Sequence, residues 1–264
     1  MAHPIWQGNL SFGLINIPIS LYTAISRQDL KFRFLHKVCG TPIEYRKYCP
    51  KCKKEVEWEE VVRGYEHEKG KFVILSEVDF EKADIELTKT IDIVDFVSLT
   101  EIEPYFFDRP YYLVPQKGAA KTYHLLVRAL QEDKKVGIAK VVIKTREYLA
   151  AIVPIEGGLL LETLYFDYEI KKLKDYELPS APALADKEIK LAKQIIEELT
   201  EKFNPKSYTD TYRQKLLEII KKKAAGKKVT VPTEREEISA KEFEDLMAAL
   251  KESMAEIKKE KTKV

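Results

Sequence analysis

Residues 137–166, GIAKVVIKTREYLAAIVPIEGGLLLETLYF, decide the fold class of this chain. The stretch is rich in β-branched residues, and its apolar positions alternate with polar ones over much of its length. Glycine, proline and charged residues interrupt it at intervals. We therefore predict three successive short strands, over 137–146, 149–154 and 159–166.

The same alternation extends toward the N-terminus. We predict further strands over 10–22, 31–35, 71–75, 91–99 and 111–115, which brings the number of predicted strands to eight. Many short strands with turn residues between them are typical of a barrel or a sandwich. The spacing also predicts one helix over 119–133, with Leu126, Val127 and Leu130 on one apolar face.

The chain changes character after Pro179 and Pro182. Apolar residues at helical spacing predict helices over 185–203 and 208–226, and a linker follows at 227–237. A last amphipathic helix is expected over 238–259, followed by a basic tail. This helix either folds back on the core or enters the groove of a partner. The candidate partner-binding residues on its apolar face are Phe243, Leu246, Met247, Leu250 and Met254.

Charge is segregated, although the formal net charge of the whole chain is only +2. Residues 27–54 hold nine basic and two acidic groups, and residues 117–147 hold eight and three. The intervening residues 55–109 hold sixteen acidic and six basic groups. Such blocks indicate surfaces with different partners, and the alternative is a set of solvated loops.

The alternation orients two groups of basic residues. Lys31 and Arg33 fall on one face of the expected strand 31–35, and Lys140, Lys144 and Arg146 fall on one face of 137–146. No aromatic platform or helix-turn-helix accompanies them, so contact with the nucleic-acid backbone is favoured over base reading. The alternative for each residue is a charge that serves solubility. The full set of candidate DNA-binding residues is Lys31, Arg33, Lys37, Arg46, Lys47, Lys51, Lys121, Arg128, Lys140, Lys144 and Arg146.

All three cysteines lie in HKVCGTPIEYRKYCPKC, residues 36–52. His36 and Cys39 form one pair three residues apart, and Cys49 and Cys52 form another. Two such pairs predict a tetrahedral zinc site, with His67 as an alternative to His36. Four protein ligands leave no open position, so the zinc would be structural. The alternative is a buried Cys39 with a redox pair at 49 and 52.

Catalytic sequence motifs are absent, so we expect that the chain is not an enzyme. Two other classes remain alternatives: a zinc-dependent nuclease or hydrolase, and a zinc-ribbon transcription regulator. No apolar run is long enough to span a membrane, and residues 1–10 do not resemble a secretory signal. We therefore expect a cytoplasmic, nucleoid-associated protein without a small-molecule substrate.

Several long stretches resemble the prokaryotic Ku family. They are GNLSFGLINIPISLY (8–22), VVRGYEHEKGKFVILSEVDFE (61–81), KTIDIVDFV (89–97), FFDRPYYLVPQKGAAKTYHLLVRAL (106–130) and NPKSYTDTYRQKLLEIIKKKAAGK (204–227). The likeness covers residues 1–228 in order and extends to DLMAALKESM (245–254).

The resemblance implies a mixed α+β protein with an intertwined β-barrel core and a helical arm, which forms a homodimeric ring. Such a ring threads onto double-stranded DNA ends without reading sequence and recruits DNA ligase D in non-homologous end joining. We expect a core over 1–182, which includes a small zinc-knuckle-like insertion at 36–54. A dimerising arm would span 183–228, and the linker, ligase-recruiting helix and basic tail would span 229–264.

Overall fold

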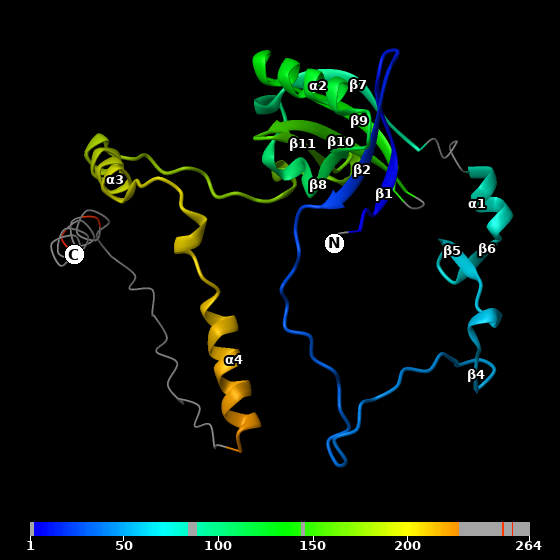
Figure 1. Cartoon of the computed structure of the whole chain (residues 1–264). Helices are drawn as coiled ribbons and strands as arrows, with labels where there is room; N and C mark the ends of the chain where they lie inside the picture. Colours follow the sequence, from blue (N-terminus) through cyan, green and yellow to red (C-terminus); the bar gives the residue numbers. More distant parts are fainter. Residues whose placement is uncertain (1–2, 84–88, 144–145, 227–249, 251–254, 256–264) are drawn as a thin grey trace. The chain divides into compact units, whose positions relative to one another are not determined.

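Seven strands close into one barrel in the computed structural model of the chain (Figure 1). Their order around the barrel is β1 (Trp6–Phe12), β2 (Ile15–Thr23), β8 (Phe107–Pro115), β11 (Gly158–Leu164), β10 (Arg146–Ile155), β9 (Lys135–Ile143) and β7 (Thr90–Ser98). The structure describes residues 3–83, 89–143, 146–226, 250 and 255. The expected mixed α+β class with a barrel is confirmed.

The barrel closes where β1 meets β7 in a parallel pairing, with Leu10 opposite Ile91. Gly8 lies at this seam, and a β-carbon added there would stand 2.1 Å from the carbonyl oxygen of Lys89. Only a residue without a side chain lets the two backbones approach so closely. The other neighbouring strands of the barrel pair antiparallel.

The inward residues of these strands and one helix make the hydrophobic core. The helix α2 (Ala120–Glu132) contacts β9, β10 and β11 (Figure 1), and its Leu126, Val127 and Leu130 are buried as expected. Leu10, Ile17, Ile152 and other strand residues have no exposed surface. Burial of each such side chain contributes about 1.5–3 kcal/mol, so the barrel is the stable part of the fold.

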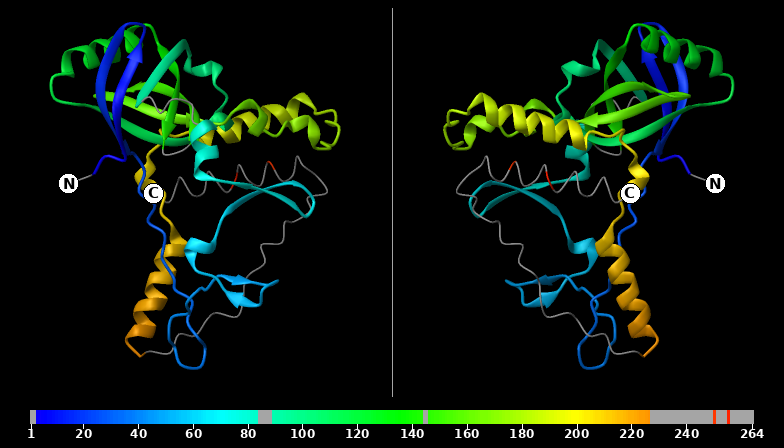
Figure 2. Two further views of the ribbon diagram at one scale, coloured as in Figure 1. Left: turned by 90° about the vertical axis from the view of Figure 1, so that its right-hand side faces the viewer. Right: turned by 90° about the vertical axis from the view of Figure 1, so that its left-hand side faces the viewer.

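Residues 24–83 leave the barrel after β2. This excursion contains two small antiparallel ribbons, β3 (Tyr48–Cys49) with β4 (Lys54–Glu55) and β5 (Arg63–Glu68) with β6 (Lys71–Leu75). Figure 2 shows β5 and β6 as a two-stranded ribbon. The helix α1 (Glu77–Ala83) follows, and the amide of Asp79 donates to the hydroxyl of Ser76 at 3.3 Å.

The strand expected over 31–35 is not formed. Residues 25–34 contain neither helix nor strand, and only Leu35 makes an isolated bridge, to Pro42. Phe32 and Phe34 are 66% and 73% exposed. The alternation is present, but pairing is limited to this bridge and to one hydrogen bond from the Ile43 amide to the Phe34 carbonyl at 3.0 Å. No described segment covers the phenylalanine side chains, and a strand needs both a continuous partner and a buried face.

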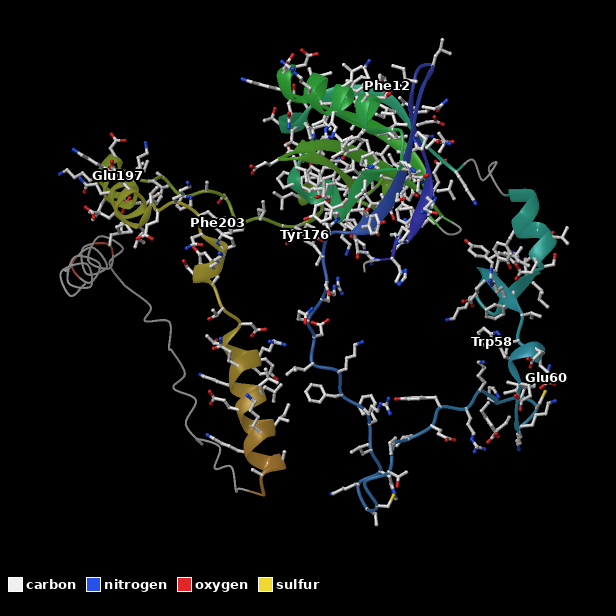
Figure 3. The ribbon with its side chains drawn as sticks, viewed as in Figure 1. Phe12, Trp58, Glu60, Tyr176, Glu197 and Phe203 are labelled. Carbon is white, nitrogen blue, oxygen red and sulfur yellow. The ribbon has the colours of Figure 1, made fainter. Side chains whose placement is uncertain are left out.

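The second compact unit, residues 177–264, contains α3 (Asp186–Leu199) and α4 (Thr211–Ala224). Both expected helices are confirmed with shorter bounds. Single-turn 3₁₀ helices also occur along the chain, at Trp58–Glu60, Leu99–Glu101, Pro104–Phe106, Asp167–Glu169, Leu173–Asp175 and Pro205–Ser207. Side chains of Glu197 in α3 and of Phe203 after it are labelled in Figure 3.

Most of the last expected helix lies outside the described residues. This applies to Phe243, Leu246, Met247 and Met254. Leu250 is described and is helical and partly buried.

Candidate nucleic-acid interface

The exposed basic residues divide into those that have a partner within the chain and those that do not. Within the described part of the chain, five of the predicted DNA-binding side chains make neither an ion pair nor a cation–π contact: Lys31, Arg33, Lys37, Lys51 and Lys121. All five are exposed. A cation without an internal partner can meet a phosphate without first giving up another interaction, so these five are the most available of the set.

Other predicted DNA-binding cations are already paired. Arg128 Nε lies 2.6 Å from Glu132 Oε1 one helical turn away on α2. Lys140 Nζ lies 3.6 Å from Glu147 Oε1, and both lie on the outer face of the β9–β10 hairpin. Such exposed pairs contribute about 0–1 kcal/mol, so a phosphate can replace the carboxylate. Lys144 lies outside the described residues.

The expected common face of Lys140, Lys144 and Arg146 is wrong for Arg146. The strand β9 ends at Ile143, and Arg146 begins β10 directly opposite Ile143. Arg146 therefore shares the face of Ile143, whereas Lys140 lies on the other face. The residues between the two strands include no glycine or proline, so the sequence did not signal the reversal. Arg146 pairs with Glu169 at 2.6 Å. The backbone amide of Phe166, together with Arg146, holds the pKa of the Glu169 carboxyl below its usual range.

Arg46 and Lys47 lie beside the β3–β4 ribbon, and both are held by neighbours. Arg46 Nη1 donates to both carboxylate oxygens of Glu55, at 3.1 and 3.3 Å. The ammonium of Lys47 lies 3.5 Å from the ring centre of Trp58, a cation–π contact. Trp58 is labelled in Figure 3. Both basic groups therefore have a set position next to the cysteine-containing loop.

The four predicted zinc ligands form two local pairs. His36 Nδ1 lies 3.1 Å from Cys39 Sγ, and the backbone amide of Cys52 donates to Cys49 Sγ at 3.5 Å. Hydrogen bonds from Thr41 and His36 lower the pKa of Cys39 to about 7. Backbone amides also lower the pKa of Cys49, whereas the adjacent Cys49 raises that of Cys52. Among the described residues no three potential ligands gather at one point, so the zinc site stays a prediction.

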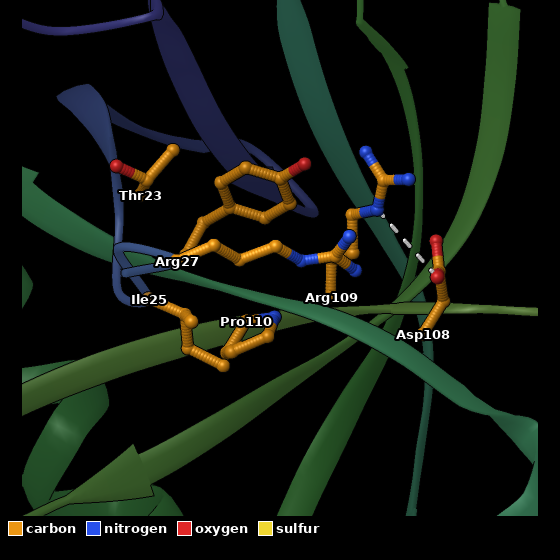
Figure 4. Close-up of a pocket in the computed structure, with 7 residues that line it drawn as sticks. Thr23, Ile25, Arg27, Asp108, Arg109 and Pro110 are labelled. Carbon is orange, nitrogen blue, oxygen red and sulfur yellow. Dashed lines mark ion pairs between the residues drawn. The ribbon is translucent and has the colours of Figure 1, made fainter. Parts of the chain in front are cut away.

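A cleft beside β8 brings together two arginines that are absent from the set of DNA-binding residues predicted from the sequence. Arg27 and Arg109 line a hollow of about 360 Å³ with Thr23, Ile25, Asp108, Pro110 and Tyr111 (Figure 4). The strand register makes this possible, because Thr23 at the end of β2 lies opposite Tyr111 on β8. The amide of Ala24 also donates to the carbonyl of Pro110 at 3.2 Å. The only sequence signal was the basic block that begins at Arg27.

Asp108 orients the arginine next to it. Its Oδ1 lies 3.6 Å from Arg109 Nε and accepts a hydrogen bond from the Tyr165 hydroxyl at 3.2 Å. Its Oδ2 accepts from the hydroxyl of the buried Thr163 at 3.3 Å. The negative charge of Asp108 raises the pKa of Tyr165. The Asp108 carboxylate is thus held by barrel residues, and its ion pair with Arg109 is made through Nε.

A second hollow, of about 520 Å³, is largely apolar. Its lining comprises Leu99, Thr100, Ile102, Glu103, Pro104, Phe107, Val153, Leu160 and Glu162. Burial raises the pKa of Glu162. Among the described residues, no ion pair or hydrogen bond to the Glu162 carboxylate compensates for its loss of hydration.

These features define a class of protein. The fold is a β-barrel that carries long segments with exposed cations, which is the surface chemistry of a protein that binds nucleic-acid phosphates. In the described part of the chain, no helix is long and apolar enough to cross a membrane.

Comparison with known proteins gives the family. A family model described as the Ku70/Ku80 beta-barrel domain matches residues 11–198. The chain is 43% identical to Non-homologous end joining protein Ku of Opitutus terrae over 251 residues, which are 95% of this chain and 90% of that protein. The proteins of the same name from Bacillus subtilis and Archaeoglobus fulgidus are 38% and 36% identical. These matches cover 96% of this chain in both cases, and 81% and 98% of the relatives.

The chain belongs to the Ku family of non-homologous end joining proteins. This membership confirms the resemblance drawn from the sequence and the expectation that the chain is not an enzyme. It gives no support to a zinc-dependent nuclease or a zinc-ribbon regulator.

Proposed function

We propose that this protein binds double-stranded DNA ends without reading their sequence, as a ring-shaped homodimer, and recruits DNA ligase D for end joining. The observation that carries the proposal is membership of the Ku family together with five exposed, unpaired cations within the described residues. Cations of this kind bind phosphates, which every DNA sequence offers equally.

A homodimer is supported by apolar side chains that the described chain does not cover. Tyr65, Phe72 and Ile74 on the β5–β6 ribbon are each 64% exposed or more. A lone two-stranded ribbon is only marginally stable, so contact with a partner would stabilise it. Ile196 and Leu199 on α3 are exposed as well. Apolar residues gathered on separate segments are expected to be buried by a partner, and a second copy of the chain is the partner we propose.

A structural zinc ion is part of the proposal. The two ligand pairs have the spacing and the local contacts of zinc knuckles, and the lowered pKa of Cys39 and Cys49 favours the thiolates that zinc binds. His36, Cys39, Cys49 and Cys52 would hold the ion, which would bring both pairs together. The ion would shape the loop that carries Arg46, Lys47 and Lys51.

Ligase recruitment is assigned to the C-terminal segment. The apolar positions Phe243, Leu246, Met247, Leu250 and Met254 follow helical spacing and suit the groove of a partner. Deletion of residues 238–264 should leave DNA binding largely intact and abolish stimulation of DNA ligase D. Full stimulation by the shortened chain would exclude this role.

The central experiment compares linear and closed circular DNA of the same sequence. A ring can thread only onto a free end, so we expect tight binding to the linear duplex and negligible binding to the circle. Competition in a gel-shift assay measures the difference, and cutting the circle once should restore binding. Equal affinity for the two forms would refute end binding.

A further inference from the structure

The cleft that contains Arg27 and Arg109 has the chemistry of an anion site. Its side chains offer two guanidinium groups and the hydroxyls of Thr23 and Tyr111, and its one acidic residue, Asp108, is bound by Arg109 Nε, Thr163 and Tyr165. Figure 4 shows the side chain of Arg27 extending toward Arg109. Two guanidinium groups beside each other repel unless an anion lies between them, and a phosphate suits their planar, forked donors.

Neither guanidinium is used up by the chain. Within the described residues, Arg27 makes no hydrogen bond or ion pair, and Arg109 is held through Nε alone, which leaves its terminal nitrogens available. The Arg109 side chain is 68% exposed. The Asp108 carboxylate, in turn, is held by Thr163 and Tyr165. Arg109 is thus oriented in advance for a ligand, which reduces the entropic cost of binding.

The course of the chain indicates which anion is bound. Arg27 lies in a run without helix or strand, residues 25–34, which also contains Lys31 and Arg33, both exposed and unpaired within the described residues. Four residues of chain span up to about 13 Å. Phosphates of one DNA strand follow each other about every 3.4 Å of axis, so Arg27 and Lys31 can meet different phosphates of one strand.

We propose that Arg27 and Arg109 together clasp one internal phosphate of the DNA backbone. This inference rests on the proposed function and adds to it a particular contact on the barrel itself. Thr23 and Tyr111 offer further hydrogen bonds from the same cleft. The clasp carries no sequence information, in keeping with binding of any DNA end.

A double-mutant cycle tests the clasp. Arg27→Gln and Arg109→Gln should each weaken binding to linear duplex about tenfold at low salt, because each removes a charged hydrogen bond. If both hold one phosphate, the double variant should lose little more, and its slope of log affinity against log salt should fall by about 0.9. A slope change near 1.8 in the double variant, about twice the value for one phosphate, would indicate two separate phosphates and overturn the clasp.

Further variants separate the clasp from general charge and from unfolding. Arg109→Lys keeps the charge but loses the forked donors, so it should weaken binding nearly as much as Arg109→Gln. Wild-type affinity in Arg109→Lys would mean that only charge matters and would contradict the proposal. Both arginines are exposed, so the melting temperatures of the variants should match the wild type.

The DNA ends distinguish the source of the phosphate. Duplexes with 5′-phosphate and 5′-hydroxyl ends should show the same loss in both variants, since the clasp holds an internal phosphate. A loss confined to 5′-phosphorylated ends would overturn that assignment. Unchanged binding by both variants, with linear DNA still preferred over circles, would refute the clasp alone. Failure of the wild-type chain to prefer linear DNA would refute the proposed function and the clasp with it.

Discussion

The hydroxyl of Tyr123 on α2 donates a hydrogen bond to the carbonyl oxygen of Leu113 on β8, at 2.6 Å. The same hydroxyl accepts one from the amide of Leu159 on β11, at 2.7 Å. Tyr123 is 2% exposed, and burial raises its pKa. One buried oxygen therefore ties the helix to two neighbouring strands of the barrel.

Tyr123→Phe should destabilise the barrel by about 1–3 kcal/mol, because the buried amide of Leu159 and carbonyl of Leu113 lose their partner. Each kcal/mol corresponds to a fall of about 2–4 °C in melting temperature, which calorimetry would detect. An unchanged melting temperature would mean that water or another group replaces the hydroxyl.

Gly158→Ala should also destabilise the barrel, because the new β-carbon would stand 2.8 Å from the Tyr123 hydroxyl oxygen. The double variant with Tyr123→Phe removes that oxygen. Its loss of stability should therefore be smaller than the sum of the two single losses. Additive losses in chemical denaturation would show that the two positions do not interact.

Glu162→Gln should stabilise the protein at neutral pH. Burial raises the pKa of Glu162, so folding disfavours its ionised form, and stability increases as pH falls through the raised pKa. Glutamine has no charge to bury, so its advantage should disappear once the glutamate is protonated. Melting temperatures of both proteins across this pH range measure the effect. A constant difference at all pH values would contradict a cause based on charge.

Lys31→Gln and Arg33→Gln should weaken DNA binding more than Arg128→Gln. The first two cations are unpaired within the described residues, whereas the charge of Arg128 is balanced by Glu132. Removal of one cation that binds a phosphate should reduce the salt slope by about 0.9. Binding assays on linear duplex at several salt concentrations supply the slopes. A larger effect of Arg128→Gln would show that internal pairing does not govern availability.

Cys49→Ser should abolish zinc binding and lower the melting temperature, because four ligands are needed to close the proposed site. His36→Gln and His67→Gln form a matched pair that identifies the fourth ligand. We expect loss of zinc with the first and retention with the second. Metal analysis of each purified protein gives the zinc content. Equal stability of the wild type with and without a chelator would argue against a structural ion.

Much of the fold could be predicted from the sequence, because short-range patterns record which residues face a core. The buried face of α2 and most of the barrel strands follow from alternation and helical spacing. The pattern misled at 31–35, where no described segment covers the two exposed phenylalanine side chains, and at Arg146, where the chain reverses without glycine or proline. In both places the alternation is present, but pairing between segments decides whether a strand forms and where it ends.

The candidate site divides in the same way. The sequence by itself determined the Ku resemblance, the basic blocks and the spacing of the cysteine and histidine pairs, since all of these are local in the chain. Only the tertiary structure decided that Glu169 neutralises Arg146 and that Arg27 and Arg109 share a cleft. The reason is the pairing of β2 with β8, which joins positions more than eighty residues apart. No local pattern records that register, because it depends on how the whole barrel closes.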